Sequence, residues 1–328
     1  MLEHIALILG LALIYGYLNG LHGSAGIVAT MISSRALGPR QSLLLAAVGI
    51  SAGPFLLGTA VANTIGAELI APEATNVTVV IAGLTGAVLW SALTLWLRLP
   101  SSISQALLGG LIGAAWAGFG QQAILPTGFN KVVLSLLLSP ILGVIGGFVM
   151  VRFSYWLTAS ATPHINKWFK RGQVLISLFM AISFGANDGQ KIIGIIVLGM
   201  SATGLLQSFM VPSWVVGFSA FAIGFGTLMG GWRLIHTLGG RFYRIRPIHG
   251  FGAQIASSLT IFGAAVLGGP VSGMQVIASS IVGAGGADRI QKVRWGAMTP
   301  IMIGWLLTLP FSALVGALTY YVVEGIIR

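Results

Sequence analysis

The chain has no cysteine and very little charge. Only 6 of its 328 residues are acidic, and charged residues make up 7% of it, against roughly 25% in an ordinary soluble domain. The absence of cysteine excludes disulfide bonds, iron–sulfur clusters, thiolate-bound haem and thiol catalysis. Hydrophobic residues make up 56%, and the mean hydropathy is +0.94. This composition predicts an integral membrane protein.

Several apolar stretches reach the roughly 20 residues that a helix needs to cross a bilayer. The sequence therefore predicts an all-α, multi-pass protein of the cell (inner) membrane. The first stretch begins with Glu3 and His4 and runs too long for a cleavable signal peptide, so we expect it to belong to the mature fold. The expected spans cover about residues 5–34, 42–65, 77–97, 130–157, 173–200, 211–232, 248–268 and 295–323.

The net charge of +11 comes from basic residues that gather at the ends of these stretches. Two basic clusters flank one pair of expected spans. Because two crossings return the chain to the same side, we expect both clusters to face the cytoplasm. No aromatic platform or nucleic-acid motif accompanies them, so nucleic acid is not an expected partner. The clusters comprise Lys167, Lys170 and Arg171, and then Arg233, Arg241, Arg244 and Arg246.

A short motif occurs twice in the chain. The segments "LPSSISQALLGGLIGA", from Leu99, and "GPVSGMQVIASSIVGA", from Gly269, both fit P-x-S-x-x-Q followed by a later glycine. The order of apolar stretches around the motif also repeats. When His22-Gly23 is aligned with Asn187-Asp188, the stretch up to the motif proline has nearly the same length in both halves. We therefore predict two homologous repeats, residues 1–161 and 173–328, joined by an amphipathic segment, 162–172. The matched pairs are Pro100 with Pro270, Ser102 with Ser272, Gln105 with Gln275, and Gly113 with Gly283.

Each repeat is expected to contain a broken helix and a re-entrant helical hairpin. The glycine-interrupted segments 19–30 and 183–194 are the expected breaks, and residues 99–124 and 270–289 are the expected hairpins. Such repeats are typical of secondary transporters whose site lies at the repeat interface. Four crossings in each half would make the repeats parallel, whereas inverted repeats need an odd number, so the orientation stays open at this point.

Asp188 is the only acid expected deep inside a span, where an unpaired carboxylate is costly. Lys191 follows one helical turn later, and Asn187 and Gln190 lie beside the pair. One interpretation is an ion pair that only stabilises the helix. The other is a cavity in which the carboxylate and amide oxygens bind a monovalent cation or a proton, while the ammonium binds an anion.

Serines follow the proline of each expected hairpin. Because proline readily starts helices, these serines are expected in the first turn of a half-helix, where free N–H groups attract anions. Capping without a ligand is the alternative for either hairpin alone. Two matching hairpins favour a site for a small oxyanion. The serines are Ser101, Ser102 and Ser104 in the first hairpin, and Ser272 in the second.

These motifs resemble those of the inorganic phosphate transporter (PiT) family. The segment "NGLHGSAGIVATMISSRAL" is similar to the family's first signature, "FGANDGQKIIG" to its second, and the two P-x-S segments to its paired hairpins. The resemblance runs from about residue 15 to 312. It implies inverted repeats, no cofactor, and uptake of inorganic phosphate coupled to a sodium ion or a proton. The expected coupling-ion residues are Asn187 and Asp188, as the metal ligands, with Asn19, His22 and Ser24. The expected substrate residues are Ser101, Ser102, Ser104, Gln105, Ser272, Gln275, Gln190 and Lys191.

The chain departs from the family pattern at four positions. Gly23 and Gly26 stand where the first signature carries Asp and Asn. Gly273 and Met274 replace hydroxyl residues in the second hairpin. An acid, an amide and two hydroxyls are thereby lost relative to the pattern, which leaves the coupling stoichiometry open.

We therefore predict a symporter, not an enzyme, that moves inorganic phosphate by alternating access. The alternatives are a permease for sulfate or another oxyanion and an uncoupled anion channel. An enzyme acting on a lipid phosphate fits less well, since the sequence offers no second deep acid and no evident histidine base for a serine. The expected partners are phosphate or a similar oxyanion, a monovalent cation and the lipid bilayer, with a homodimer left open.

Overall fold

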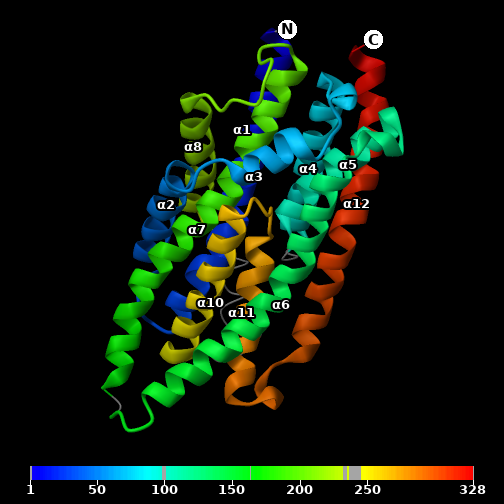
Figure 1. Ribbon diagram of the computed structural model, residues 1–328. Helices are drawn as coiled ribbons and strands as arrows, with labels where there is room; N and C mark the ends of the chain where they lie inside the picture. Colours follow the sequence, from blue (N-terminus) through cyan, green and yellow to red (C-terminus); the bar gives the residue numbers. More distant parts are fainter. Residues whose placement is uncertain (1, 98–100, 163, 232–234, 236–244, 328) are drawn as a thin grey trace.

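The computed structural model describes residues 2–97, 101–162, 164–231, 235 and 245–327, and these are helical with no β-sheet (Figure 1). The predicted all-α fold is confirmed. The α-helices are α1 (Leu2–Ser33), α2 (Pro39–Leu56), α3 (Ala60–Asn63), α4 (Val77–Trp96), α5 (Ile103–Phe119), α6 (Pro126–Leu157), α7 (Ile165–Ala202), α8 (Ser213–Met229), α10 (Pro247–Val266), α11 (Gly273–Asp288) and α12 (Trp295–Ile327). Short helices are η1 (Thr64–Glu68), a π-helix, and the 3-10 turns η2 (Pro72–Ala74), η3 (Gln121–Ala123) and η4 (Ile290–Lys292).

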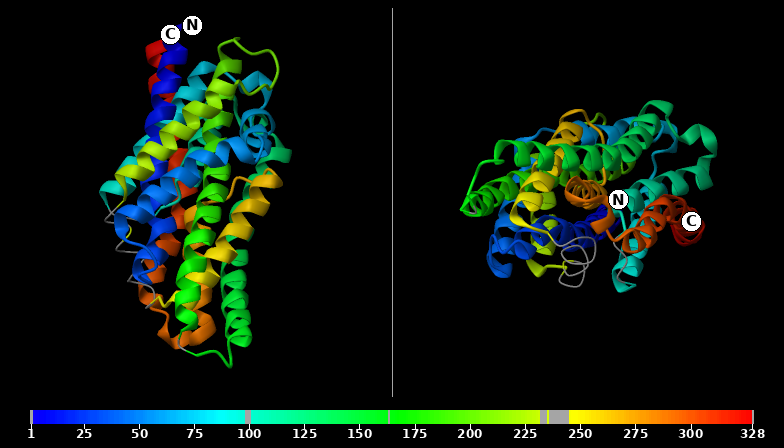
Figure 2. Two further views of the ribbon diagram at one scale, coloured as in Figure 1. Left: turned by 90° about the vertical axis from the view of Figure 1, so that its left-hand side faces the viewer. Right: turned by 90° about the horizontal axis from the view of Figure 1, so that it is seen from below.

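The long helices run along one axis of an elongated body (Figure 2). Among the described residues, α1, α4, α6 and the segment Met298–Ile326 of α12 are long and apolar enough to cross a membrane. The bent pair formed by α2 with Ala60–Glu68 adds a fifth candidate. The helix α7 is as long as these, but it carries four polar side chains in its middle, from Asn187 to Lys191. The chain is thus a multi-pass membrane protein.

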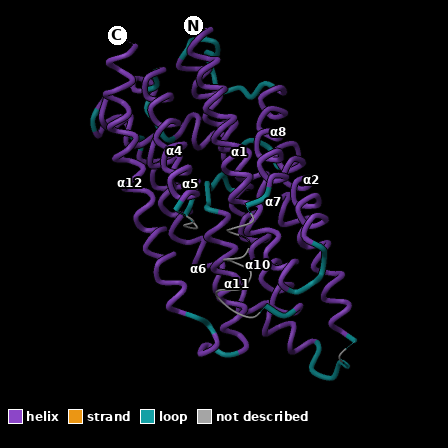
Figure 3. The backbone as a smooth tube through the Cα atoms, turned by 180° about the vertical axis from the view of Figure 1, so that it is seen from behind, coloured by secondary structure: helices purple, strands orange, loops and turns teal. Residues whose placement is uncertain are grey.

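Two helical hairpins enter the body from opposite ends. The helices α10 and α11 lead from one end to mid-height and back, and α4 and α5 do the same from the other end (Figure 1). Seen from behind, the end of α4 and the start of α5 again lie near the middle (Figure 3). The hairpins are therefore larger than the expected segments 99–124 and 270–289, because the stretches expected as spans at 77–97 and 248–268 form their first arms.

This correction settles the orientation of the repeats. The first half starts beside the N-terminus and finishes with α6 at the opposite end, where α7 begins (Figure 1). The second half then finishes with α12 beside the N-terminus. Each half crosses the body an odd number of times, so the repeats are inverted. The expected count of four crossings was wrong because one arm of a hairpin is as long and as apolar as a crossing.

The expected helix breaks at 19–30 and 183–194 are not present, since both segments lie inside continuous helices, α1 and α7. The glycines there allow close packing instead. A Cβ at Gly20 would collide with the backbone of α8, and one at Gly185 would collide with the backbone of α2. The break lies in the expected span 42–65, where the chain turns by 70° between α2 and α3. Gly58 takes a φ of +70° at this turn, a conformation that favours glycine.

The two halves are interleaved rather than side by side. The helix α5 packs mainly on α12, α11 on α6, α2 on α7, and α1 on α8, so each of these contacts joins one half to the other. The expected connecting segment 162–172 is partly absorbed by α7, which begins at Ile165. The basic residues Lys167, Lys170 and Arg171 lie at the end where α6 meets α7, whereas Arg233, Arg241 and Arg244 lie outside the described residues.

Candidate functional site

A buried ion pair lies in the middle of α7. Asp188 and Lys191 are 2% and 0% exposed, and the Lys191 ammonium donates a hydrogen bond to Oδ1 of Asp188. The two residues are one helical turn apart on a continuous helix, so they share a face. A pair this deeply buried is stabilised only if its remaining polar atoms also find partners.

The Lys191 ammonium meets that requirement through the tips of both hairpins. Nζ lies 2.6 Å from Oγ of Ser104, in the first turn of α5, and 2.6 Å from the carbonyl oxygen of Val271, just before α11. Together with Asp188, these acceptors satisfy all three N–H groups of an ammonium. Oγ of Ser104 also lies 3.5 Å from Oδ1 of Asp188. One side chain of α7 therefore holds the starts of two half-helices that come from opposite halves of the chain.

Asn187 and Gln190 lie on either side of this pair but bind different elements. Nδ2 of Asn187 donates to the carbonyl oxygen of Gly269, in the turn of the second hairpin, at 2.9 Å. Its Oδ1 is buried and has no hydrogen-bond partner among the described residues. Gln190 instead accepts a hydrogen bond from the backbone N–H of Val61 at 2.7 Å, and its Nε2 lies 3.4 Å from the carbonyl oxygen of Leu57. Gln190 thus bridges the break between α2 and α3.

The serines at the two hairpin tips differ in the hydrogen bonds that they make. Ser102 is the N-cap of α5, and its Oγ accepts a hydrogen bond from the N–H of Gln105 at 3.1 Å. Ser101 donates to Oγ1 of Thr94 at 2.7 Å and so joins the two arms of its hairpin. Ser272 occupies the N-cap position of α11 but makes no capping hydrogen bond. The first N–H groups of α11 therefore lack the side-chain acceptor that those of α5 have.

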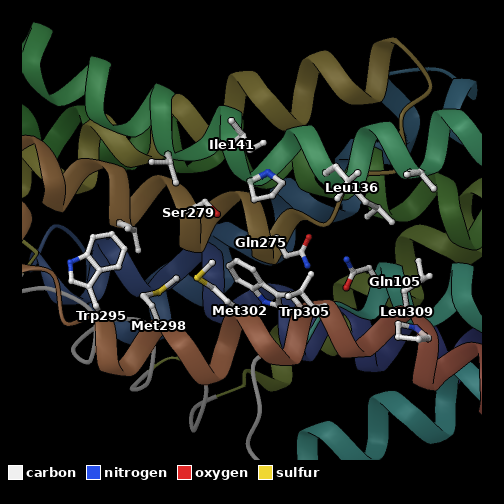
Figure 4. A pocket seen from close by; sticks show the side chains of 17 residues that line it. Gln105, Leu136, Ile141, Gln275, Ser279, Trp295, Met298, Met302, Trp305 and Leu309 are labelled. Atoms are coloured by element: carbon white, nitrogen blue, oxygen red, sulfur yellow. The ribbon is translucent and has the colours of Figure 1, made fainter.

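A cavity of about 500 Å³ lies between α6, α11 and α12 and reaches the hairpins. Its walls are mostly apolar, with Trp295 at one end and the two motif glutamines at the other (Figure 4). The side chains of Gln105 and Gln275 point toward one another there. Both are buried, and neither Oε1 has a hydrogen-bond partner among the described residues. Two buried acceptors without a described partner therefore lie beside the cavity, close to the hairpin tips.

The residues expected from the first signature lie on α1 and are also buried. Nδ1 of His22 lies 3.0 Å from the carbonyl oxygen of Leu18, while its Nε2 and Nδ2 of Asn19 have no hydrogen-bond partner among the described residues. Oγ of Ser24 accepts from the N–H of Gly231 at 3.0 Å, just after α8, and donates to the carbonyl oxygen of Leu21. Ser24 therefore fastens α1 to the end of α8.

Two residues beside the buried ion pair, Val271 and Phe184, were not indicated by the sequence motifs. Val271 takes part through its backbone carbonyl oxygen, which every residue type has, so the sequence gives no indication of this role. Phe184 lies one helical turn before Asp188, is 1% exposed, and packs against Gly23 and Gly273. Its spacing of four residues from Asp188 placed it on the same helical face and could have indicated it.

The possible donors for a cation near Asp188 are oxygen atoms. Within the described part of the chain, no group of three or more His, Cys, Asp or Glu residues could hold a metal ion. A monovalent cation at Asn187 and Asp188 would have the Asp188 carboxylate and the unpartnered Oδ1 of Asn187, together with nearby hydroxyl and carbonyl oxygens. These are hard oxygen donors, as a sodium ion prefers.

Comparison with known proteins agrees with this geometry. A model of the phosphate transporter family matches the chain twice, over residues 19–163 and 157–316. The chain is 36% identical to a probable low-affinity inorganic phosphate transporter of Rhizobium meliloti (strain 1021), over 97% of this chain and 96% of that protein. It is also 36% identical to a protein of the same description from Bacillus subtilis (strain 168), over 96% of each.

A solved structure described as the sodium-dependent phosphate transporter has the same fold. Its TM-score is 0.88 at 21% identity, over 98% of this chain and 99% of that one. The named relatives are transporters rather than enzymes. On the two family matches, which together cover most of its length, the chain belongs to the phosphate transporter family.

Proposed function

We propose that this chain is a symporter that moves inorganic phosphate across the cell membrane together with a sodium ion or a proton. The observation that carries the proposal is the position of the Lys191 ammonium, which joins Asp188 to both hairpin tips at once. The description of the structural neighbour as sodium-dependent supports a sodium ion as the first candidate. The basic end of the body, with Lys167, Lys170 and Arg171, faces the cytoplasm in this proposal.

The coupling follows from the charge of the buried pair. Asp188 and Lys191 together carry no net charge, so a buried anion beside them would leave an uncompensated negative charge, which is costly in the membrane. A cation bound at Asp188 offsets that charge and frees the Lys191 ammonium for the anion. Binding of either ion therefore favours binding of the other, and this mutual dependence is the basis of symport.

The anion would bind where the two half-helices start. The uncapped N–H groups in the first turn of α11, those that Ser102 leaves free in the first turn of α5, and the positive dipole ends of both helices favour an oxyanion. The oxygens of Gln105 and Gln275 supply acceptors. Monobasic phosphate has O–H groups to donate to them, whereas sulfate has none near neutral pH. Lys191 already binds the Asp188 carboxylate, so this carboxylate is not the acceptor for phosphate. The unpartnered amide oxygens of the two glutamines take that place and favour phosphate over sulfate.

Movement of the halves would expose the loaded site to each side in turn. The α4–α5 hairpin belongs to the first repeat, taken as residues 1–161, and the α10–α11 hairpin to the second, taken as 173–328. The cavity beside Gln105 and Gln275 is the proposed passage from the site. Because Lys191 binds both hairpins, its release is the step that lets them move apart.

The test is uptake of labelled phosphate by the purified full chain in liposomes, with sodium and proton gradients imposed separately. Uptake driven by one of the two gradients, with sulfate a weak competitor, is the expected result. Asp188→Asn should abolish the response to the gradient, while Glu68→Gln, which changes a partly exposed carboxylate paired with Lys131, should not. Gradient-driven uptake that Asp188→Asn leaves unchanged would contradict the coupling role, and flux without any gradient would identify a channel.

A further inference from the structure

The charged pair of the polar cluster on α7 has glycines as its counterparts on α1, whereas the counterpart of Asn187 is His22. In the alignment of the two repeats, Asp188 corresponds to Gly23 and Lys191 to Gly26. On the hairpins, the pairing of Ser102 with Ser272 makes Met274 the counterpart of Ser104. The contact between Lys191 and Ser104 should therefore be mirrored by one between Gly26 and Met274. The structure contains it, because a Cβ at Gly26 would lie 2.9 Å from Sδ of Met274.

Phe184 fills the space beside this counterpart. A Cβ at Gly23 would lie 2.6 Å from Cε1 and Cζ of the Phe184 ring, and a Cβ at Gly273 would also collide with that ring. The ring is thus wedged between α1 and α11 and is 1% exposed. A Cβ at Gly26 would in addition meet Ile277 at 3.0 Å. The volume that side chains at positions 23, 26 and 273 would occupy is taken up by aromatic, thioether and aliphatic groups.

Among the described residues, this packing places no oxygen ligand for a cation in closest contact with positions 23, 26 and 273. A dehydrated monovalent cation requires several oxygen ligands, and the groups nearest to positions 23, 26 and 273 are a phenyl ring, a sulfur atom and aliphatic carbon. The loss of the acid at Gly23 is matched by a side chain that occupies its space, so the site is filled rather than left open to water. The symmetric fold thus carries a polar site on its α7–α5 side and a sealed one on its α1–α11 side.

We propose that Phe184 seals the α1–α11 side against cations, so that one monovalent cation accompanies each monobasic phosphate and transport moves no net charge. This inference rests on the symport proposed above. The buried pair on α7 is neutral, and the loaded site, with one cation and one monovalent anion, is neutral as well. The empty and loaded carriers therefore have the same charge, and the membrane potential should not affect either step.

The experiment measures initial phosphate uptake by the full chain in liposomes under the driving cation gradient, with and without a potassium diffusion potential. The pH is kept mildly acidic so that monobasic phosphate predominates. Imposing about 100 mV should change the rate less than about twofold, whereas one net charge moved through that potential could change it up to about fifty-fold. The dependence on cation concentration should have a Hill coefficient close to one.

Two variants test the role of the ring. In Gly23→Asp/Phe184→Ala the new carboxylate has room, and uptake should become sensitive to the potential, with a Hill coefficient approaching two. Phe184→Leu keeps the space largely filled and should keep the wild-type stoichiometry. The single change Gly23→Asp would press a carboxylate against the ring, so a low folded yield is expected, and a second change at position 184 should raise it.

The outcomes separate this inference from the function on which it rests. Uptake with strong potential dependence and a Hill coefficient near two in the wild type would overturn the single-cation inference and leave the symporter intact. A folded double variant that stays insensitive to the potential would also overturn it, because Phe184 would then not be what excludes the second cation. Absence of phosphate uptake under either gradient would remove the symport itself.

Discussion

The ammonium nitrogen of Lys191 lies 2.6 Å from the carbonyl oxygen of Val271, so a side chain of α7 binds the backbone that leads into α11. The same nitrogen donates to Ser104 on α5. The two hairpins come from different halves of the chain and enter from opposite ends. Lys191 is thus a direct physical link between the parts that a transporter with inverted repeats must move.

Lys191→Met should destabilise the protein and abolish uptake. The change leaves the buried carboxylate of Asp188 without its cation, and breaking a buried pair in this way costs about 3–5 kcal/mol. The loss of stability is measured by thermal unfolding of the purified protein in detergent, with size-exclusion chromatography to detect the folded fraction. Lys131→Met is the matched control, because the Lys131 side chain is 38% exposed and its ammonium pairs with Glu68 near the surface. The control should lose about 1 kcal/mol or less, and equal losses in both variants would contradict the role of Lys191.

The fold was largely predictable because apolar length and glycine content are properties of the sequence. The hairpin arms were not, because α4 has 20 apolar residues and its composition cannot tell a crossing from an arm that turns back. The direction of a helix depends on the partner it packs against, and α4 packs on α5 and on α12 of the other half. Glycine in α1 and α7 likewise predicted breaks, where the structure uses it for close helix contacts.

The candidate site was predictable where a polar residue stands in apolar surroundings. Asp188 and Lys191 were indicated in this way, and the structure places them beside both hairpins. The roles of Val271, whose backbone oxygen is used, and of Gln190, which bonds α3, depend on three-dimensional neighbours. No pattern along the chain contains that information.

Gln190→Leu should affect stability more than transport. Gln190 accepts a hydrogen bond from the N–H of Val61, and its loss leaves a buried donor unsatisfied at the break between α2 and α3. The expected cost is about 1–3 kcal/mol, seen as a lower unfolding temperature. The KM values for phosphate and for the driving cation should stay close to those of the wild type. A stable Gln190→Leu variant with a much higher KM for phosphate would instead indicate that Gln190 binds the substrate, as the sequence predicts.

The matched serines Ser102 and Ser272 should respond differently to the same change. Ser102→Ala removes the N-cap hydrogen bond of α5 and should cost about 1 kcal/mol of stability. Ser272→Ala removes no capping bond, so stability should hardly change. Since Ser272 is one of the expected substrate residues and its hydroxyl is not used as a cap, the loss of this hydroxyl should raise the KM for phosphate about fivefold, the equivalent of about 1 kcal/mol. Paired measurements of unfolding temperature and uptake distinguish the two, and an unchanged KM for phosphate in Ser272→Ala would contradict the role of Ser272 at the anion.

Gln275→Leu should weaken the preference for phosphate over sulfate. The Oε1 of Gln275 is buried and has no partner among the described residues, and the side chain points toward Gln105 (Figure 4), so this oxygen can accept a hydrogen bond from an O–H group of monobasic phosphate bound there. Loss of one such hydrogen bond should raise the KM for phosphate about fivefold, while inhibition by sulfate, which has no proton to donate, stays the same. Gln254→Leu is the control, because its buried Oε1 is also unpartnered but its Nε2 bonds Thr30, away from the cavity. The control should lose stability without a change in KM. If sulfate inhibition weakened in parallel with phosphate uptake, Gln275 would shape the cavity without accepting a hydrogen bond from the anion.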